Sequence, residues 1–428
     1  MKILLVNPPN SGRSIPEERY GIDSIKQIFR GEPLALEVLA GNLADFETAI
    51  CDLKAAPGTL IAELAAFRPD LVGITGVTCE ANTVLDLARQ AKESGATTVV
   101  GGVHASNDPE FFNRAEVDYV VVGLGRVSFR ELAENMAGGK TATPNGVAKT
   151  SPGRPLSLVP RRFSAADAGG EPPPAYELVK KHRSHYRLER LGLDMGFVVS
   201  AYGCPFDCEF CCISGLTGGN YLTVPVESVV RDIGLLPTPV IRLLDANTFG
   251  NPKHAESLCE AISKSGTKKA FLADVRSDTV VKYPGLMKKW QEAGLKAVII
   301  GFEEIDDKRL AGFNKKNQAA INTEAIAILH EIGITIVGDF IINPDYEEDD
   351  FARLGHYISD NSIDLPMITV LTPLPGTRLH QGMKDRIIVD DLDFYTLTNA
   401  VLPTRLPEEK FYRLYADLMI EGHKNASL

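Results

Sequence analysis

Short apolar runs rich in β-branched residues alternate with helical patterns along most of the chain, and this alternation restricts the possible folds more than any other feature. Runs that are apolar at nearly every position are typical of parallel strands buried on both faces. Five such runs occur early in the chain, at Lys2–Val6, Ala49–Asp52, Leu71–Thr75, Thr97–Gly101 and Asp118–Val122. Five strands joined by right-handed helical crossovers predict a doubly wound, Rossmann-like α/β structure.

A second series of strand and helix patterns begins near Gly196. Its six strand-like runs are Phe197–Ala201, Val240–Leu244, Ala270–Asp274, Ala297–Ile300, Thr335–Ile341 and Met367–Leu371. Six such repeats predict a partial (β/α)6 barrel, whose chemistry lies at the carboxyl ends of the strands. The Pro-, Gly- and Ser-rich segment between the two series predicts a linker. The expected domains are 1–140, a linker at 141–195, the barrel at 196–380 and a short C-terminal cap at 381–428, with an amphipathic stretch at Glu408–Glu421.

Three cysteines are spaced for an iron–sulfur cluster. Cys204, Cys208 and Cys211 form a C-x3-C-x2-C run directly after the apolar stretch Gly196–Ser200. Thiolates at this spacing can each ligate one iron of a [4Fe-4S] cluster and leave the fourth iron open to a small molecule. A structural zinc loop is the alternative, but zinc sites usually combine two Cys or Cys/His pairs, and no second pair follows here. Cys212 is expected to pack nearby rather than to ligate iron.

Composition narrows the classes of partner. The 428 residues carry a net charge of −11, and no Lys/Arg run stands out among them. Nucleic-acid binding needs a concentrated basic surface, so we expect no nucleic-acid partner. No stretch approaches the roughly 18 consecutive apolar residues of a membrane span, and the N-terminus lacks the features of a signal peptide. Seven cysteines, four of them within Cys204–Cys212, suit a reducing compartment and a cofactor rather than a disulfide framework, so we expect a cytoplasmic protein. The single cysteines Cys51, Cys79 and Cys259 are expected in the core.

The cysteine run, together with the strand before it and its aromatic neighbours, resembles the signature of the radical S-adenosylmethionine (SAM) superfamily. The resemblance implies that the open iron chelates the amino and carboxylate groups of SAM. It also implies that residues beside the cysteines and at the strand ends bind SAM: Tyr202, Phe210, Asp245, Arg276 and Glu303. Arg276 would face the SAM carboxylate, which a planar guanidinium suits. Glu303 matches the family's Gly-x-Glu-Ser, although Glu304 replaces the Ser.

The strand ends of the first series resemble the loops that line the corrin ring in B12-dependent radical SAM enzymes. The resemblance implies cobalamin-binding positions at Asn7, Pro8, Thr75, Thr78, Gly101, Gly102, His104, Gly123 and Gly125. The last loop reads Gly-Leu-Gly-Arg, where the family often has Gly-Glu-Gly-Glu. The chain lacks the D-x-H-x-x-G motif, so we expect no protein His on cobalt. His104 is expected either near the corrin or in a local hydrogen bond, and a Rossmann domain that binds no corrinoid stays open.

The resemblance implies a cobalamin-dependent radical SAM C-methyltransferase. Such an enzyme uses a [4Fe-4S] cluster to cleave SAM to a 5′-deoxyadenosyl radical, and methylcobalamin to methylate an unactivated carbon of a small metabolite. Aromatic or benzimidazole-like, tetrapyrrole-like and isoprenoid-like substrates fit the family, and a flavodoxin or ferredoxin would serve as reductase. A cyclase, oxidase or rearranging enzyme of the anaerobic tetrapyrrole cyclase type is the alternative. A tRNA methylthiotransferase is disfavoured, because it would need three cysteines in the N-terminal domain and only Cys51 and Cys79 lie there. A non-enzymatic electron carrier is disfavoured as well, because it would normally hold its cluster with four cysteines.

Overall fold

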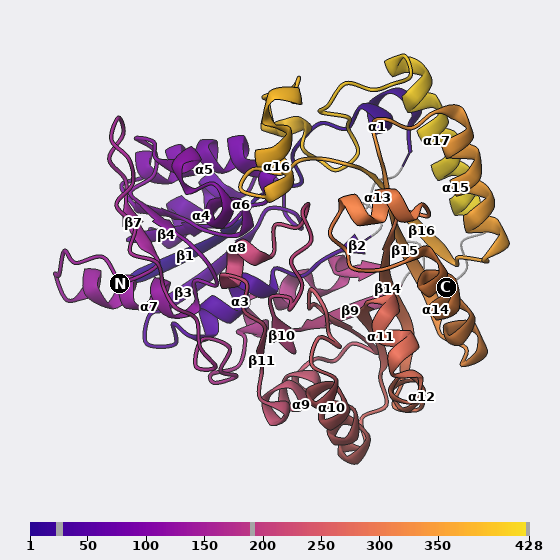
Figure 1. Cartoon of the computed structure of the whole chain (residues 1–428). Coiled ribbons are helices and arrows are strands. Elements are labelled where there is room, and N and C mark those ends of the chain that lie inside the picture. The colour runs from indigo at the N-terminus through magenta and orange to yellow at the C-terminus, as the bar shows by residue number, and fades with distance from the viewer. Residues whose placement is uncertain (23–28, 189–192, 425–428) are drawn as a thin grey trace.

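The computed structural model describes residues 1–22, 29–188 and 193–424, and its two main sheets lie side by side (Figure 1). The first sheet has the strand order β3-β1-β4-β5-β6-β7. Its strands are β1 (Lys2–Asn7), β3 (Glu47–Asp52), β4 (Leu71–Ile74), β5 (Thr97–Val100), β6 (Tyr119–Val121) and β7 (Val147–Lys149). Five strands are parallel, as predicted, and β7 pairs antiparallel with β6. The sheet therefore extends into the segment that the sequence predicts as linker, because a three-residue strand is too short to show an alternating pattern.

The helices beside the first sheet are α3 (Leu34–Gly41), α4 (Leu60–Phe67), α5 (Ala81–Glu93), α6 (Val103–Asn107) and α7 (Arg126–Ala137). Short 3-10 turns η1 (Thr78–Glu80) and η2 (Pro109–Phe112) follow β4 and α6. Since the five parallel strands point the same way, the loops that follow β1, β4, β5 and β6 meet at one edge of the sheet.

The second sheet has the order β16-β15-β14-β13-β12-β9-β8-β2. The six parallel strands predicted for the barrel are β9 (Leu193–Val198), β12 (Val240–Leu243), β13 (Ala270–Val275), β14 (Leu295–Glu303), β15 (Thr335–Ile342) and β16 (Leu365–Val370). Their helices are α8 (Ser214–Thr217), α9 (Val226–Leu235), α10 (Pro252–Ser265), α11 (Ser277–Lys282), α12 (Pro284–Glu292), α13 (Asp307–Gly312), α14 (Ala319–Glu331), α15 (Glu348–Asp360) and α16 (Arg378–Met383). A separate hairpin joins β10 (Ala201–Tyr202) to β11 (Leu222–Thr223). The partial barrel is thus confirmed.

Two chain crossings join the sheets, and the sequence indicates neither. After β1 the chain reaches the barrel, where β2 (Phe29–Arg30) pairs with β8 (Arg187–Leu188), which in turn pairs with β9. On the way α1 (Ile15–Tyr20) packs against α17 (Glu408–Lys424), and Figure 1 shows the two helices, indigo and yellow, beside each other.

The tail makes the reverse crossing. Leu392, Tyr395 and Val401 are buried in the core of the first sheet, and Asn82 of α5 donates to the Asp393 carboxylate at 3.0 Å. The cap therefore covers both units, whereas tails of this family are expected to cover the barrel.

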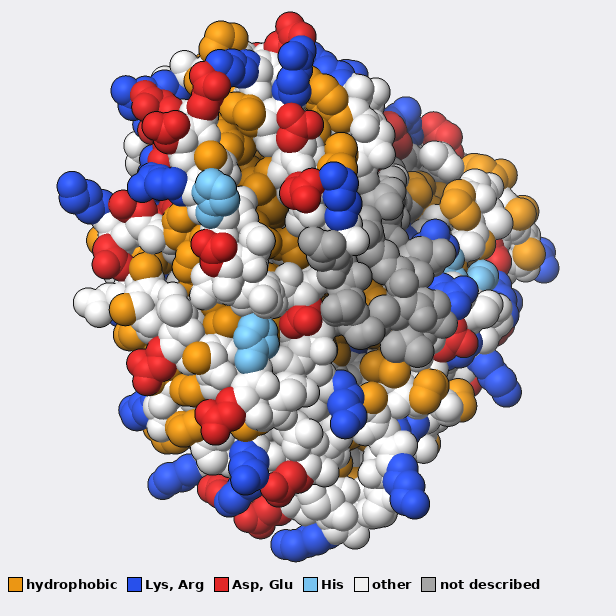
Figure 2. Space-filling view, turned by 90° about the vertical axis from the view of Figure 1, so that its right-hand side faces the viewer, with side chains coloured by type: hydrophobic (Ala, Val, Ile, Leu, Met, Phe, Trp, Pro, Cys, Tyr) orange, Lys and Arg blue, Asp and Glu red, His pale blue; other side chains and the backbone are white. Residues whose placement is uncertain are grey.

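The described residues form no concentrated basic area on the face that lies to the right in Figure 1. Figure 2 shows acidic and basic side chains intermixed across that face. No helix among the described residues is long and apolar enough to cross a membrane.

Candidate functional site

A cavity of about 580 Å³ lies where the loops of the first sheet meet the barrel. Six of the predicted cobalamin positions line it: Asn7, Thr75, Gly101, Gly102, Gly123 and Gly125. The barrel contributes Val199, Tyr202, Leu216 and Leu244 to the opposite wall. Because the four loops approach one space, a ligand there contacts the carboxyl ends of β1, β4, β5 and β6 together, as expected for this sheet type.

Glycines at two of these loops allow close backbone approach. At Gly102, φ is 94°, and an added Cβ would lie 2.5 Å from Thr75 Oγ1 and 2.9 Å from the Gly76 nitrogen. At Gly123, φ is 92°, and an added Cβ would lie 2.2 Å from the Phe163 ring. Both positions combine a left-handed backbone with no room for a side chain, so the structure requires glycine at each.

The cavity lining suits a large macrocycle with polar substituents. Most of the wall is apolar, with Leu34, Val38 and Leu39 of α3 on one side. Polar groups lie among them: Asn7 donates to Asp52 at 2.8 Å, and Lys54 pairs with Glu80 at 2.8 Å. A corrin ring presents a flat apolar face and amide side chains, and this lining offers partners for both. The residues present therefore fit cobalamin.

Three of the predicted cobalamin positions, Pro8, Thr78 and His104, are not among the residues that line the cavity. The His104 ring is 1% exposed and packs edge-on against Phe111 and Phe112, with ring centroids 5.2 and 5.5 Å apart. No described residue bonds to either ring nitrogen, and burial lowers the pKa of His104 to about 4. The expected local hydrogen bond of His104 is therefore not found, because the helix turns the ring into the core, and the expected position near the corrin stays a prediction. Thr78 begins the 3-10 turn η1 instead.

Asp245 binds the segment that leads into the cysteine loop. Its buried carboxylate accepts hydrogen bonds from the Ser200 amide at 2.7 Å, the Ser200 hydroxyl at 2.6 Å and the Ala201 amide at 2.9 Å. Three donors from the strand end occupy this carboxylate. Asp245 therefore positions the start of the loop, and its contact with SAM stays a prediction.

Arg276 also has an internal role that the sequence does not predict. It pairs with Asp278 through two contacts of 3.0 and 2.9 Å and donates to the Lys315 carbonyl at 2.9 Å. Its guanidinium lies 3.6 Å from the centroid of the Phe206 ring, which belongs to the cysteine loop. The planar fork that suits a SAM carboxylate faces the Asp278 carboxylate of the chain itself, and its contact with SAM stays a prediction.

Glu303 lies near the cysteine loop and forms a buried ion pair. Its carboxylate lies 2.5 Å from the Lys315 amine, and both charges perturb Cys208 electrostatically. Glu303 has a φ of 64°, uncommon for a residue with a side chain. A Cβ on Gly301 would lie 2.3 Å from the Glu303 carboxylate and 2.7 Å from the Lys315 amine. Gly301 therefore leaves the space that the ion pair occupies.

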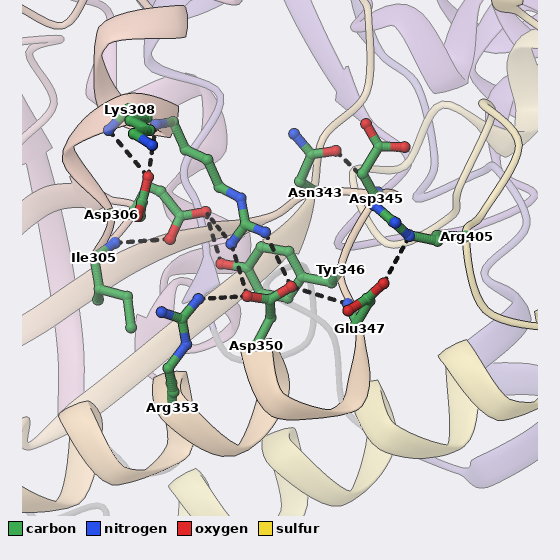
Figure 3. A network of polar contacts seen from close by, with 12 residues as sticks. Ile305, Asp306, Lys308, Asn343, Asp345, Tyr346, Glu347, Asp350, Arg353 and Arg405 are labelled. Atoms are coloured by element: carbon green, nitrogen blue, oxygen red, sulfur yellow. Dashed lines mark hydrogen bonds and ion pairs between the residues drawn. The ribbon is translucent and has the colours of Figure 1, made fainter.

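Glu304, at the position where the family has Ser, belongs to a network of polar contacts. Its carboxylate accepts from the Tyr346 hydroxyl at 2.7 Å and from the Ile305 amide at 2.8 Å. Figure 3 shows Tyr346 and Asp350 close together in this network. Arg309 stacks 4.5 Å from the Tyr346 ring centroid and pairs with Asp350 at 2.9 Å. These contacts connect the loops after β14 and β15, so Glu304 holds two strand ends together.

Phe210 anchors the middle of the cysteine loop. Its ring packs edge-on against Phe313 at 5.5 Å between centroids, beside an apolar cluster of Ile341, Leu371 and Leu379. Arg378, next in the chain to Leu379, donates to the Glu209 carboxylate at 3.0 Å. Phe210 thus fastens the loop to the barrel end.

The cysteine loop carries three thiols that could ligate iron. Cys204, Cys208 and Cys211 are all partly accessible and unpaired. A [4Fe-4S] cluster takes each thiolate on a different iron. Burial raises the pKa of Cys211 to about 12, so iron would have to displace its proton. The donor set therefore fits the cluster.

Two family models match the chain, the B12 binding domain over residues 26–133 and the radical SAM superfamily over residues 198–358. The chain belongs to the B12-binding radical SAM family. The hopanoid C-3 methylase of Methylococcus capsulatus is 29% identical over 400 residues, covering 90% of this chain and 75% of that protein. The bacteriochlorophyllide d C-8(2)-methyltransferase of Chlorobaculum tepidum is 26% identical over 353 residues, covering 78% and 73%.

Solved structures support the same fold for this radical SAM protein. The radical SAM methyltransferase TsrM from Kitasatospora setae, solved with cobalamin and a [4Fe-4S] cluster, superposes with a TM-score of 0.72. The match covers 98% of this chain and 90% of TsrM at 17% identity, which shows the shared architecture of both units.

Sequence reasoning missed several residues of the site. Leu216 and Leu244 line the cavity from the barrel, and Lys54 from the first sheet. Apolar side chains at strand and helix ends carry no signal of their own in a single sequence. Lys54 follows a predicted strand end, so its position could have indicated a role.

Proposed function

We propose that this chain is a cobalamin-dependent radical SAM C-methyltransferase acting on a small, largely apolar metabolite. One observation carries the proposal: the cavity of the first sheet and the cysteine loop share a wall. Tyr202, two residues before Cys204, lines the cavity, and so does Leu216 of α8, which follows the loop. When bound, an iron–sulfur cluster supplies the electron for reductive SAM cleavage, and a corrinoid supplies the methyl group. This arrangement would place both chemistries beside one substrate.

Some residues of the cavity would bind the corrinoid, and others would exclude water. We assign corrinoid contact to the loop residues that line the cavity: Asn7, Thr75, Gly101, Gly102, Gly123 and Gly125. Leu34, Val38 and Leu244 offer apolar walls that would exclude water from reactive species.

On the barrel side we assign Cys204, Cys208 and Cys211 to the cluster. Asp245 would hold the strand end before them in register through its three hydrogen bonds. Glu303 and Lys315 are the charged pair within electrostatic reach of Cys208 and are the proposed contacts for the charged end of SAM.

The substrate class follows from the lining and from the relatives. The named activities of the two relatives concern a hopanoid and a bacteriochlorophyllide, one isoprenoid and one tetrapyrrole. The apolar barrel wall of the cavity favours such a substrate, or an aromatic one, over a sugar or nucleotide. The chain's seven cysteines, four of them within Cys204–Cys212, suit a reducing compartment such as the cytoplasm, where a flavodoxin or ferredoxin would supply electrons.

The test uses the full chain, purified without oxygen and reconstituted with iron, sulfide and hydroxocobalamin. It is incubated with SAM and a strong reductant, and 5′-deoxyadenosine and S-adenosylhomocysteine are quantified together by mass spectrometry. Both products, the second dependent on cobalamin, would support methyl transfer. Deoxyadenosine alone would favour the cyclase or rearrangement class. The absence of both products would refute the methyltransferase and the cyclase proposals alike.

A matched pair of cysteine variants tests the metal assignment. Cys208→Ala should abolish iron binding and deoxyadenosine formation. Cys259→Ala removes a thiol from α10, away from the loop, and should leave both unchanged. Retained SAM cleavage in Cys208→Ala would overturn the assignment.

A further inference from the structure

Helix α6 lies between the cavity and the cysteine loop. Its five residues follow Gly101 and Gly102, which line the cavity, and it packs against α8, which follows the cysteines. The last residue of the helix is Asn107, which no motif of the sequence singles out. Its contacts make a connection between the two halves of the site.

The Asn107 amide bonds to both elements at once. Its Nδ2 donates to the Val103 carbonyl of α6 at 2.8 Å and to the Cys212 carbonyl of the cysteine loop at 3.0 Å. Both partners are acceptors, so the group facing them must be the amide NH2. One side chain therefore uses its two N–H bonds to join the end of α6 to the residue that follows Cys211.

Two glycines leave the space for this junction. A Cβ on Gly215 would lie 2.5 Å from Asn107 Oδ1, and a Cβ on Gly376 would lie 2.3 Å from the Asn107 carbonyl oxygen. Gly215 belongs to α8, and Gly376 to the turn before α16. Three segments thus close around Asn107, and none of them can shift far without breaking its contacts.

The other side of α6 is tied to the cavity. The Ser106 hydroxyl accepts from the Gly123 amide at 2.9 Å and donates to the Gly102 carbonyl at 2.7 Å. Gly102 and Gly123 both line the cavity. A molecule that packs against these two glycines therefore also restrains the helix that carries Asn107.

We propose that α6 couples occupancy of the cavity to the order of the cysteine loop, with Asn107 as the positioning residue. A ligand held against Gly102 and Gly123 fixes α6, and Asn107 passes that restraint to Cys212. The naming of cobalamin as the ligand rests on the proposed function, whereas the link between α6 and the loop does not.

The experiment measures amide hydrogen exchange of the full chain by mass spectrometry, without oxygen, with and without hydroxocobalamin. The cysteine loop contains bonded amides to follow, since Glu209 donates to the Phe313 carbonyl at 3.0 Å and Cys211 to the Cys208 carbonyl at 3.2 Å. In the wild type, hydroxocobalamin should slow exchange in residues 203–215. In Asn107→Ala the loop should exchange about fivefold faster without ligand, the factor expected for one lost hydrogen bond.

The same variant should still bind hydroxocobalamin, seen in its visible spectrum, but without slowing exchange in the loop. Asn135→Ala is the control, because Asn135 donates to the Ala142 carbonyl at 3.0 Å within the first unit and far from the cysteines in sequence. Loop exchange equal to wild type in Asn107→Ala would overturn the proposal.

A second variant leaves Asn107 in place. Gly215→Ala should displace the Asn107 amide and loosen the loop in the same way, while Gly234→Ala, where a Cβ meets nothing within 4 Å, should not. Unchanged exchange in Gly215→Ala would count against the proposal. If hydroxocobalamin fails to bind the wild type, the proposed function fails, and the comparison without ligand still decides the role of Asn107.

Discussion

The buried ring of His104 gives a prediction whose size follows from the structure. The ring is held among Phe111 and Phe112, no described residue bonds to its nitrogens, and burial lowers its pKa to about 4, opposed only by Asp108 nearby. In the unfolded chain the pKa returns to 6.5. Below pH 6.5 the unfolded chain therefore binds a proton that the folded chain refuses, and stability falls as the pH falls.

The difference of about 2.5 pKa units corresponds to about 3.4 kcal/mol once the pH is below 4. Between pH 7 and pH 5 the same linkage lowers the free energy of unfolding by about 1.8 kcal/mol. His104→Leu removes the titrating group and nearly conserves volume. The wild type should therefore lose about 1.8 kcal/mol more than the variant between these two pH values.

Urea titrations followed by circular dichroism at pH 7 and pH 5 measure this double difference. His356→Gln is the control, because that residue is exposed on α15. The variant should also keep the visible spectrum of bound hydroxocobalamin, since the ring is not among the residues that line the cavity. An equal loss of stability in wild type and His104→Leu would refute the argument, and a lost cobalamin spectrum would refute the placement of His104.

Three further predictions concern Glu37 of α3, Asp245 and Gly301. Burial, with repulsion from Glu32, raises the pKa of Glu37 well above 4.5, so wild-type stability should fall as pH rises above that value, by up to about 1.4 kcal/mol per pH unit. Glu37→Gln should remove that slope in urea titrations, unlike Glu93→Gln on the surface of α5. Asp245→Ala should cost about 3–5 kcal/mol by leaving three buried donors without an acceptor, and should lower the iron bound after reconstitution; full iron binding would contradict this. Gly301→Ala should displace the Glu303–Lys315 pair, cost about 1–3 kcal/mol and weaken SAM binding measured by calorimetry, whereas Gly285→Ala, with nothing near its Cβ, should do neither.

The residues at the strand ends show how much of the site could be predicted from the sequence. Glycines and Asn7 at the ends of β1, β5 and β6 line the cavity as predicted, because a parallel sheet brings all its carboxyl ends to one edge. The sequence did not predict the internal contacts of the polar residues at the barrel ends. Asp245 and Arg276 lie at the expected strand ends, where their carboxylate and guanidinium have partners within the chain. A residue type and its spacing do not reveal which partner a side chain will meet.

The two βα series, the cysteine loop and its place after a strand could be predicted from the residues alone, because these features depend on local period and spacing. The contacts between distant segments could not be predicted in this way. The strand β2 crosses to β8, the tail enters the core of the first sheet, and Asn107 meets Cys212. Each joins residues more than a hundred positions apart, where neither periodicity nor a motif records the partner. The physical reason is that such contacts are fixed by how the two sheets pack, which single-chain patterns do not encode.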